Sequence, residues 1–313
     1  MIQYLTVLLD DQSVSFCHYD NLNAMPNLID KDTLKENLIW AMKENVNVQF
    51  VYPNYHLPNE YEDLIDMVDS TKIKNFGADA DVIVVEDWNA IRNISIAEDT
   101  IYIVKTSRDD LKKHLEKFNH LLSKSSRVNV VYTDTLSFDD REIEEYEQTL
   151  RHICNSIVNK YQKGRFVQLN ILTDRILLGE MNNCDAGVKS ITLAPNGKFY
   201  LCPAFYYDNP ESNVGDCKDG ITIKNQQLLK LDHAPLCRLC DAYHCKRCVW
   251  MNMHSTLDIN TPSHQQCVIA HIERNASLYL LEQFDKNGIM LSDAKPFKKI
   301  DYLDPFNKYS KWK

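Results

Sequence analysis

Residues 237–248 read CRLCDAYHCKRC and place four cysteines within twelve positions. Each Cys-x2-Cys pair puts two sulfurs on one tight turn, where they are close enough to share a metal ion or a cluster. The two pairs are only four residues apart, whereas a zinc ribbon separates its pairs by roughly 15–20 residues. We therefore expect thiols from elsewhere in the chain to complete the ligand sets.

Cysteines are concentrated in the last part of the chain, where eight of the ten fall between residues 184 and 267. The opening MIQYLTVLLDDQSV lacks the positive segment of a signal peptide, so we expect a cytoplasmic, reducing environment in which disulfides are rare. Seven or eight thiolates exceed the needs of one zinc ion and suit two sites of three to four ligands each. The pattern predicts iron–sulfur ligation, with zinc as the alternative. The thiols are Cys184, Cys202, Cys217, Cys237, Cys240, Cys245, Cys248 and Cys267.

Some residues near these cysteines have open roles. Cys217 lies in the turn-like segment GDCKDG and could be a bystander. His244 and His264 could substitute as ligands, although a single histidine in a loop is more often a surface residue. Strand-like runs flank Pro195-Asn196-Gly197, which predicts a β-hairpin with Cys202 on its return strand.

The front of the chain alternates short apolar runs with helical patterns. Several runs are apolar at successive positions, as expected for strands covered on both faces. Helices are expected behind a capping box of Thr33 and Glu36, over 108–122, and from Ser137 onward, where Cys154 lies beside the buried stripe. The alternation predicts an α/β fold, either a parallel sheet or a partial barrel. The runs are 2–9, 47–52, 82–85, 101–104 and 128–132.

Ligands of such folds gather at the carboxyl ends of the strands. Tyr52, His56 and Asp87 are the first substrate-binding candidates at that rim, and turn or capping roles are the alternative. The chain contains no GxGxxG, Walker A, HExxH or GxSxG motif, so no catalytic residue is identified. The other residues expected at the rim are Asn54, Trp88, Lys105, Thr106, Thr133 and Asp134.

Charge and hydropathy exclude some partners. The net charge is −9 and the pI is about 5.6, so a nucleic-acid partner is not favoured and a basic or neutral peptide suits the field better. The sequence offers no stretch of eighteen uninterrupted apolar residues, so no membrane span is expected.

The cysteine spacing resembles the SPASM domain, a seven-cysteine module that follows the catalytic barrel of many radical SAM peptide-modifying enzymes. The likeness covers residues 184–281 and includes Gly197 between the first two cysteines. The quartet spacing is x2, x4, x2 here and x2, x5, x3 in the family. The resemblance implies two auxiliary [4Fe–4S] clusters. The first would use Cys184, Cys202 and Cys248, with Cys217 or an open iron site, and the second would use Cys237, Cys240, Cys245 and Cys267.

Radical SAM enzymes also carry CxxxCxxC just after the first barrel strand, and this motif holds the cluster that binds S-adenosylmethionine. This chain has only Cys17 there, in FCHYDN. Cleavage of S-adenosylmethionine at a standard cluster is therefore not expected. A site built from Cys17 and Cys154 together with a partner is a minor alternative.

The opening YLTVLLDDQSVSFCHYDN and the segment WAMKENVNVQFVYPNYHLP resemble the CXXX repeat peptide maturase family. The resemblance implies a degenerate radical-SAM-like partial (βα) barrel or open parallel sheet at 1–175, a SPASM-like iron–sulfur domain at 176–285 and a tail at 286–313. It implies maturation of a ribosomally made cysteine-repeat precursor peptide together with a separate radical SAM partner enzyme. The alternative is a non-enzymatic peptide- or partner-binding module with structural metal sites.

Overall fold

The computed structural model describes residues 2–21, 24–92, 95–178, 184–240, 242 and 247–291. The chain packs as two units, each made of two separate segments. Unit 1 contains residues 1–84 and 184–230, and unit 2 contains residues 85–183 and 231–313. This division follows packing, and the functional boundaries 1–175, 176–285 and 286–313 remain predictions.

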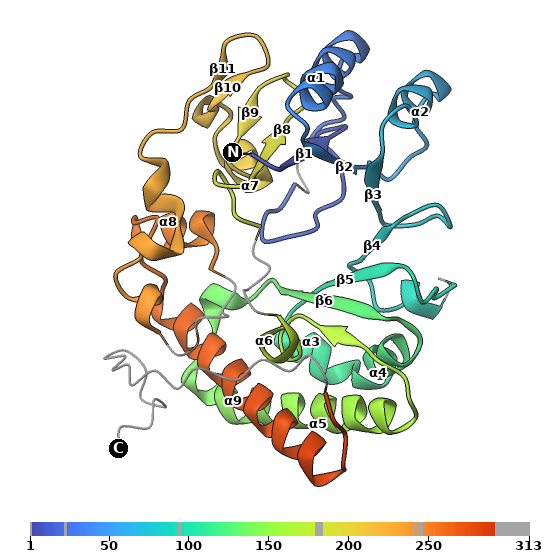
Figure 1. Cartoon of the computed structure of the whole chain (residues 1–313), viewed down its shortest axis with the longest axis vertical. Coiled ribbons are helices and arrows are strands. Elements are labelled where there is room, and N and C mark those ends of the chain that lie inside the picture. The colour runs from blue at the N-terminus through green and yellow to red at the C-terminus, as the bar shows by residue number, and fades with distance from the viewer. Residues whose placement is uncertain are drawn as a thin grey trace. The chain divides into compact units, whose positions relative to one another are not determined.

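Unit 1 is built on a sheet in which β8, β1, β2, β3 and β4 lie side by side and run parallel (Figure 1). The last four residues of β1 and all four of β4 are buried, as the uninterrupted apolar runs predict for strands covered on both faces. The bounds are β1 Tyr4–Leu8, β2 Asn47–Val51, β3 Ser70–Lys74, β4 Val82–Val85 and β8 Ser190–Leu193.

The predicted hairpin is confirmed at the far edge of this sheet. β8 pairs antiparallel with β9 across the turn that contains Gly197, whose φ of +78° is a conformation that glycine adopts without strain. Cys202 lies just beyond β9 and is the N-cap of helix α7, not a residue of the return strand. Short strands extend the edge as β9 Phe199–Tyr200, β10 Gly215–Asp216 and β11 Gly220–Ile221.

Helices α1, α2 and α7 belong to unit 1, and α1 and α2 share a hydrophobic core with β1, β2 and β8. The predicted capping box is wrong, because Asp30 is the N-cap and its carboxylate accepts the Thr33 amide N–H at 2.9 Å. Leu34, Leu38 and Ala41 are buried, and Met42 is exposed. The bounds are α1 Lys31–Lys43, α2 Asn59–Ile65 and α7 Pro203–Asp208.

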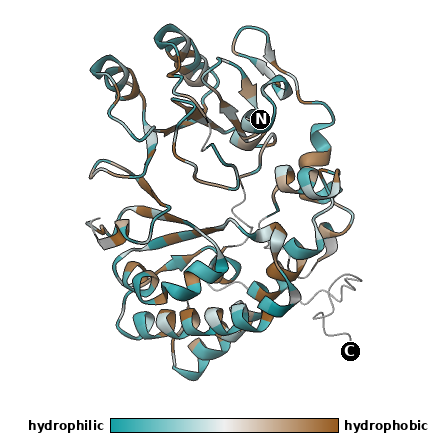
Figure 2. Ribbon diagram, turned by 180° about the vertical axis from the view of Figure 1, so that it is seen from behind, coloured by the Kyte–Doolittle hydropathy of each residue, from teal (hydrophilic) through white to brown (hydrophobic). Residues whose placement is uncertain are grey.

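Unit 2 has its own parallel strands in the order β5, β6, β7. Its helices carry both hydrophilic and hydrophobic residues, which gives the mixed colours in Figure 2. The strands are β5 Ile101–Thr106, β6 Arg127–Tyr132 and β7 Gln168–Leu169. The helices are α3 Arg108–Lys113, α4 Leu115–Lys124, α5 Ile143–Gln162, α6 Asp174–Leu177, α8 Val249–Thr256 and α9 His264–Lys286.

Two predicted helices of unit 2 have different limits in the structure. The segment 108–122 forms two helices, because His114 leaves helical geometry at φ −112°, ψ 24°. The long helix begins at Ile143 instead of Ser137, which lies in a 3-10 turn. Its predicted buried stripe is confirmed, and Cys154 is fully buried in the core, where its thiol donates to the Ala276 carbonyl.

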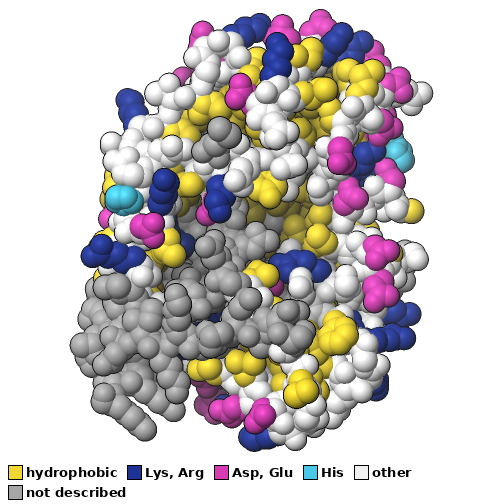
Figure 3. Space-filling view, in the orientation of Figure 1, with side chains coloured by type: hydrophobic (Ala, Val, Ile, Leu, Met, Phe, Trp, Pro, Cys, Tyr) yellow, Lys and Arg dark blue, Asp and Glu magenta, His cyan; other side chains and the backbone are white. Residues whose placement is uncertain are grey.

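The predicted α/β class with a parallel sheet is confirmed. No helix among the described residues is long and apolar enough to cross a membrane. Figure 3 shows Lys and Arg side chains interspersed with Asp and Glu side chains on the face in view. On this face, the acidic residues that give the chain its net charge of −9 therefore alternate with basic ones.

A buried ion pair ties α9 to α5 and α6 in unit 2. The Glu273 carboxylate accepts from Arg175 Nη2 and from the Tyr146 hydroxyl, both at 2.9 Å. Arg175 is almost fully buried, and its Nη1 group donates to the Ile171 carbonyl at 2.6 Å. Removing one partner of such a pair leaves the other charge buried without compensation.

We predict that Glu273→Ala lowers the free energy of unfolding by about 3–5 kcal/mol, because it leaves the Arg175 guanidinium buried without a counter-ion. The matched control is Glu282→Ala on the same helix, where the ion pair with Lys286 is exposed at 4.0 Å. That change should cost less than about 0.5 kcal/mol. Urea denaturation followed by circular dichroism measures both, and equal effects would contradict the prediction.

Candidate functional site

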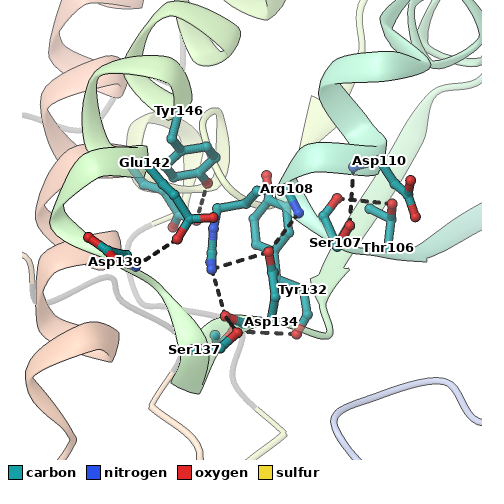
Figure 4. Close-up of polar contacts among 12 residues, drawn as sticks. Thr106, Ser107, Arg108, Asp110, Tyr132, Asp134, Ser137, Asp139, Glu142 and Tyr146 are labelled. Atoms are coloured by element: carbon teal, nitrogen blue, oxygen red, sulfur yellow. Dashed lines mark hydrogen bonds and ion pairs between the residues drawn. The ribbon is translucent and has the colours of Figure 1, made fainter.

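Arg108 occupies the carboxyl edge of the parallel strands of unit 2 (Figure 4). It is the first residue of α3, directly after β5, and Asp134 follows β6. The Arg108 amide donates to Asp134 Oδ2 at 3.0 Å, and its Nη2 group donates to the Asp134 carbonyl at 2.6 Å. The guanidinium also lies 4.3 Å from the Phe138 ring centre. These contacts join the ends of two neighbouring strands.

Several buried polar atoms at this edge have no hydrogen-bond partner among the described residues. They include Nε and Nη1 of Arg108, Oδ1 of Asp134 and Nε of Arg175. Arg108 is only 5% exposed, and each buried donor without a partner costs about 1–3 kcal/mol. Such clusters mark places where water or a ligand completes the bonding. These unpaired atoms are buried at the strand ends of unit 2.

The three first candidates make contacts of their own within their units. Tyr52 is buried in unit 1, donates to Glu62 at 3.0 Å and has Lys74 Nζ over its ring at 4.0 Å. Burial and the neighbouring Glu62 carboxylate raise the Tyr52 pKa well above its ordinary value. Its hydroxyl therefore stays protonated at neutral pH.

The other two are exposed. His56 contacts the edge of Phe76, and Asp87 accepts the Asn89 amide in a local turn. A turn role of this kind is the alternative to substrate binding that the sequence offers for the rim residues. Their part in substrate binding remains a prediction. Among the other predicted rim residues, Trp88 donates from its indole to Thr106 at 3.3 Å.

The loop after β1 in unit 1 is held by its own side chains. Asp10 is fully buried, and its carboxylate accepts from the amides of Gln12 and Asn27 and from the Tyr55 hydroxyl. Asp11 accepts from the hydroxyls of Tyr206 and Tyr207 on α7. These bonds fix the start of the loop to neighbouring elements of unit 1.

The same loop closes on itself around Tyr19. The Tyr19 hydroxyl donates to the Val14 carbonyl at 2.8 Å, and Ser15 Oγ donates to the Tyr19 carbonyl at 2.6 Å. Burial raises the Tyr19 pKa well above its ordinary value, and the nearby Cys17 and Cys202 sulfurs add to that increase. Cys17 of the loop and Cys202, which follows β9, therefore both lie close to Tyr19.

The remaining cysteines fall in both units. Cys184, Cys202 and Cys217 belong to unit 1, whereas Cys237, Cys240, Cys248 and Cys267 belong to unit 2. Cys184 is exposed, five others are half-buried, and only Cys237 is buried. Cys245 and His244 lie outside the described residues, and His264 is exposed at the start of α9.

Two of these sulfurs accept backbone hydrogen bonds of the kind that stabilise a thiolate. The Ala242 amide donates to Cys240 Sγ, and the Met251 amide donates to Cys248 Sγ, both at 3.4 Å. Cys248 is the N-cap of α8, where the helix dipole favours negative charge. The local geometry thus suits thiolate ligands of a metal.

The described side chains do not yet form a closed metal site. Among them, no three His, Cys, Asp or Glu residues lie close enough together to hold one ion. Cys240 and His271 lie close together, with Cys240 Sγ 3.6 Å from His271 Nε2. Sequence reasoning missed His271 and Arg108, because their contacts with Cys240 and Asp134 join residues that are far apart in the chain.

Solved structures share this fold. No protein-family profile and no curated protein matches the chain. The structure of anSMEcpe with bound AdoMet matches with a TM-score of 0.62 and 13% identity, over 91% of this chain and 99% of that one. Native anSMEcpe with bound AdoMet and the Cp18Cys peptide matches with a TM-score of 0.63 and 12% identity, over 92% and 100%.

A weaker likeness extends to Streptococcus suis SuiB bound to precursor peptide SuiA, with a TM-score of 0.46 and 11% identity over 83% of this chain and 74% of that one. At 12–13% identity the anSMEcpe match establishes fold. The chain thus has a radical-SAM-like α/β fold, as predicted. This match does not reach the CXXX repeat peptide maturase family, which the sequence resembles.

We predict that Cys154 and Cys184 differ strongly in reactivity. Burial raises the Cys154 pKa to about 12, so about one thiol in 10⁴ is ionised at pH 8. An ordinary exposed cysteine, with a pKa of about 8.5, is ionised roughly 10³ times more often. In metal-free folded protein, Cys184 should therefore react with iodoacetamide at least 10³-fold faster. Peptide mass spectrometry measures both rates, and similar rates would contradict the buried thiol.

Proposed function

We propose that the protein takes part in maturing a ribosomally made cysteine-repeat peptide and holds two auxiliary [4Fe–4S] clusters in a SPASM-like region. The observation that carries this proposal is the exposure of the cysteine thiols between residues 184 and 267, called the rear thiols below. Cysteine is normally among the most buried residue types, yet six of the seven described thiols from 184 to 267 are exposed or half-buried. A folded chain in a reducing, cytoplasmic setting keeps such thiols for chemistry or ligation.

The chemistry of the donor set fits iron–sulfur clusters. Thiolates are the ligands that such clusters prefer, and backbone hydrogen bonds to the sulfurs of Cys240 and Cys248 tune their charge. Cys184, Cys202 and Cys248 would hold the first cluster, and Cys237, Cys240, Cys245 and Cys267 the second. Cys217 would be the fourth ligand of the first cluster. Without it, one iron of that cluster would have no protein ligand. The clusters would supply a binding site for substrate thiols or a path for electrons.

A separate radical SAM partner enzyme would start the reaction. The loop after β1 contains only Cys17, and its hydroxyls and carboxylates bond to other parts of unit 1. A loop closed in this way does not present three thiolates to one cluster. The proposal therefore assigns this chain to binding the peptide and to its auxiliary clusters, and it assigns no cleavage of S-adenosylmethionine.

We place the peptide at the carboxyl edge of β5 and β6. A structure with the same fold, anSMEcpe, has been solved with a bound peptide. In this chain, Nε and Nη1 of Arg108 and Oδ1 of Asp134 have no partner among the described residues. Peptide carbonyls or carboxylates would accept from Arg108, and peptide amides would donate to Asp134.

The cluster proposal predicts about eight iron and eight sulfide ions per chain after anaerobic isolation. Cys202→Ala and Cys267→Ala should each remove about half of the iron, because each removes a ligand of a different cluster. Cys154→Ala is the matched control and should keep all of it, since that thiol is buried in the core. Iron and acid-labile sulfide assays measure the content. A single zinc ion without sulfide would reject the proposal.

The peptide site predicts that Arg108→Gln weakens peptide binding by roughly 10- to 150-fold, as expected for losing one charge-assisted hydrogen bond of about 1.5–3 kcal/mol. Lys112→Gln is the control, because Lys112 lies on the same helix, is partly exposed and pairs with Glu145. Calorimetry with a cysteine-repeat peptide measures both affinities, and circular dichroism checks the fold. Equal affinity of both variants for the peptide would contradict a contact between Arg108 and the peptide.

The second candidate function is a non-enzymatic binding module with structural metal sites, iron–sulfur or zinc. The self-closed loop around Tyr19 favours it, because that loop needs no cofactor to keep its shape. The peptide product formed by the partner enzyme distinguishes the two functions. If Cys248→Ala leaves the peptide product of the partner enzyme unchanged while binding persists, the binding module is correct. If the product is lost, the maturation role is supported.

A further inference from the structure

A fully buried amide lies between two of the rear thiols in unit 2. Asn252 stands one helical turn after Cys248 on α8, and its backbone N–H donates to the Cys248 carbonyl at 2.9 Å. Gln266 immediately precedes Cys267 in the first turn of α9. The Gln266 Nε2 group donates to Asn252 Oδ1 at 3.0 Å. One side-chain hydrogen bond therefore joins the turn that carries Cys248 to the turn that carries Cys267.

Backbone groups fix the orientation of both amides. Asn252 Nδ2 donates to the Ile259 carbonyl at 3.0 Å, and a carbonyl can only accept, so Asn252 Oδ1 must face Gln266. Gln266 Oε1 accepts the Ser263 amide N–H at 2.8 Å, so its Nε2 group must face Asn252. If either amide turned over, two acceptors or two donors would meet. The bond between them is therefore specified in both direction and place.

This amide pair does something that apolar packing would not do. Asparagine is seldom fully buried, because a buried amide that loses its partner is costly. Apolar side chains at positions 252 and 266 would fill the same space without that risk. A buried, fully paired polar group instead selects one arrangement of the elements that it joins. Here the selected arrangement places the start of α8 relative to the start of α9.

We propose that Asn252 is a positioning residue that fixes the separation of Cys248 from Cys267 before any metal binds. It acts through its hydrogen bond with Gln266, and neither amide is a ligand. The inference rests on the proposed function, in which Cys248 belongs to the first cluster and Cys267 to the second. The bridge would hold one ligand of each cluster at a set separation. Ligands held in this way lose less conformational freedom when the clusters bind.

The first test uses the metal-free full chain and bismaleimides of graded length. Wild-type protein should join Cys248 to Cys267 with one preferred linker length, read from the crosslinked peptides by mass spectrometry. Gln266→Glu keeps an oxygen for the Ser263 amide but turns an acceptor toward Asn252 in place of the donor. It should lower the yield at the preferred length by roughly two- to twelvefold, the equilibrium factor for one lost hydrogen bond.

Two control variants separate the bridge from charge and from helix stability. Gln265→Glu adds the same charge to the same turn of α9 and should keep the preferred length. Ser263→Ala removes the hydroxyl that caps α9 but leaves the Ser263 backbone amide to orient Gln266. It should weaken the helix and keep the preferred length. If Ser263→Ala lowers the yield as much as Gln266→Glu does, Asn252 has no positioning role.

Iron-loaded protein provides the second readout. Gln266→Glu should still bind about eight iron ions per chain, because every ligand is present. The spin–spin coupling between the two reduced clusters, recorded by electron paramagnetic resonance, should spread over a wider range than in wild-type protein. Coupling that is identical in the two proteins would overturn the proposed action on the clusters.

The two readouts distinguish failure of the bridge from failure of the clusters. Full iron and sulfide in wild-type protein without a preferred linker length overturns the bridge and leaves the proposed function standing. A preferred length without bound iron or sulfide supports the bridge and rejects the clusters. Absence of both overturns both. The wild-type crosslinking needs no variant, so misfolding of Gln266→Glu would not protect the proposal.

Discussion

Parallel strands that are buried on both faces leave no side chain for chemistry along their length. The last four residues of β1 and all four of β4 are buried in this way in unit 1. Polar residues are therefore confined to strand ends, where backbone groups also need partners. Asp10 follows β1 in unit 1, and Arg108 follows β5 in unit 2. Each is buried and joins its strand end to a neighbouring segment, which makes these ends the natural ligand positions of each unit.

The same principle of burial separates two kinds of cysteine. Cys154 is enclosed in the core of unit 2, and its raised pKa keeps it protonated and inert. Several of the thiols from 184 to 267 lie among short strands and 3-10 turns, whereas Cys248 caps α8 and Cys267 lies in α9; among those described, only Cys237 is buried. A stretch of this kind buries little apolar surface and gains stability from a metal more than a regular sheet does. Exposure and irregular structure thus point to the same use of the sulfur atoms.

Hydrophobic patterning was enough to predict the strands from 2–9 to 128–132 and the buried stripe of α5, because both depend on local periodicity. Strand β3 was missed because its sequence STKIK contains a single apolar residue, Ile73. The start of α5 was misplaced because Ser137 has the chemistry of a cap, but the chain makes two 3-10 turns before Ile143. Arg108 and His271 could not be found from sequence, since their contacts with Asp134 and Cys240 join residues 26 and 31 positions apart.

The loop after β1 connects the fold to the division of labour that we propose. In a loop with three thiolates, the cluster itself would hold the backbone in place. Here the hydroxyls of Ser15 and Tyr19 bond to backbone carbonyls within the loop, and each such bond contributes about 0.5–1.5 kcal/mol. These bonds hold the loop through protein groups alone, whereas in the function proposed above the exposed thiols from 184 to 267 would be held by metal. In that proposal the chain would hold a substrate beside auxiliary clusters, and the radical would originate in another protein.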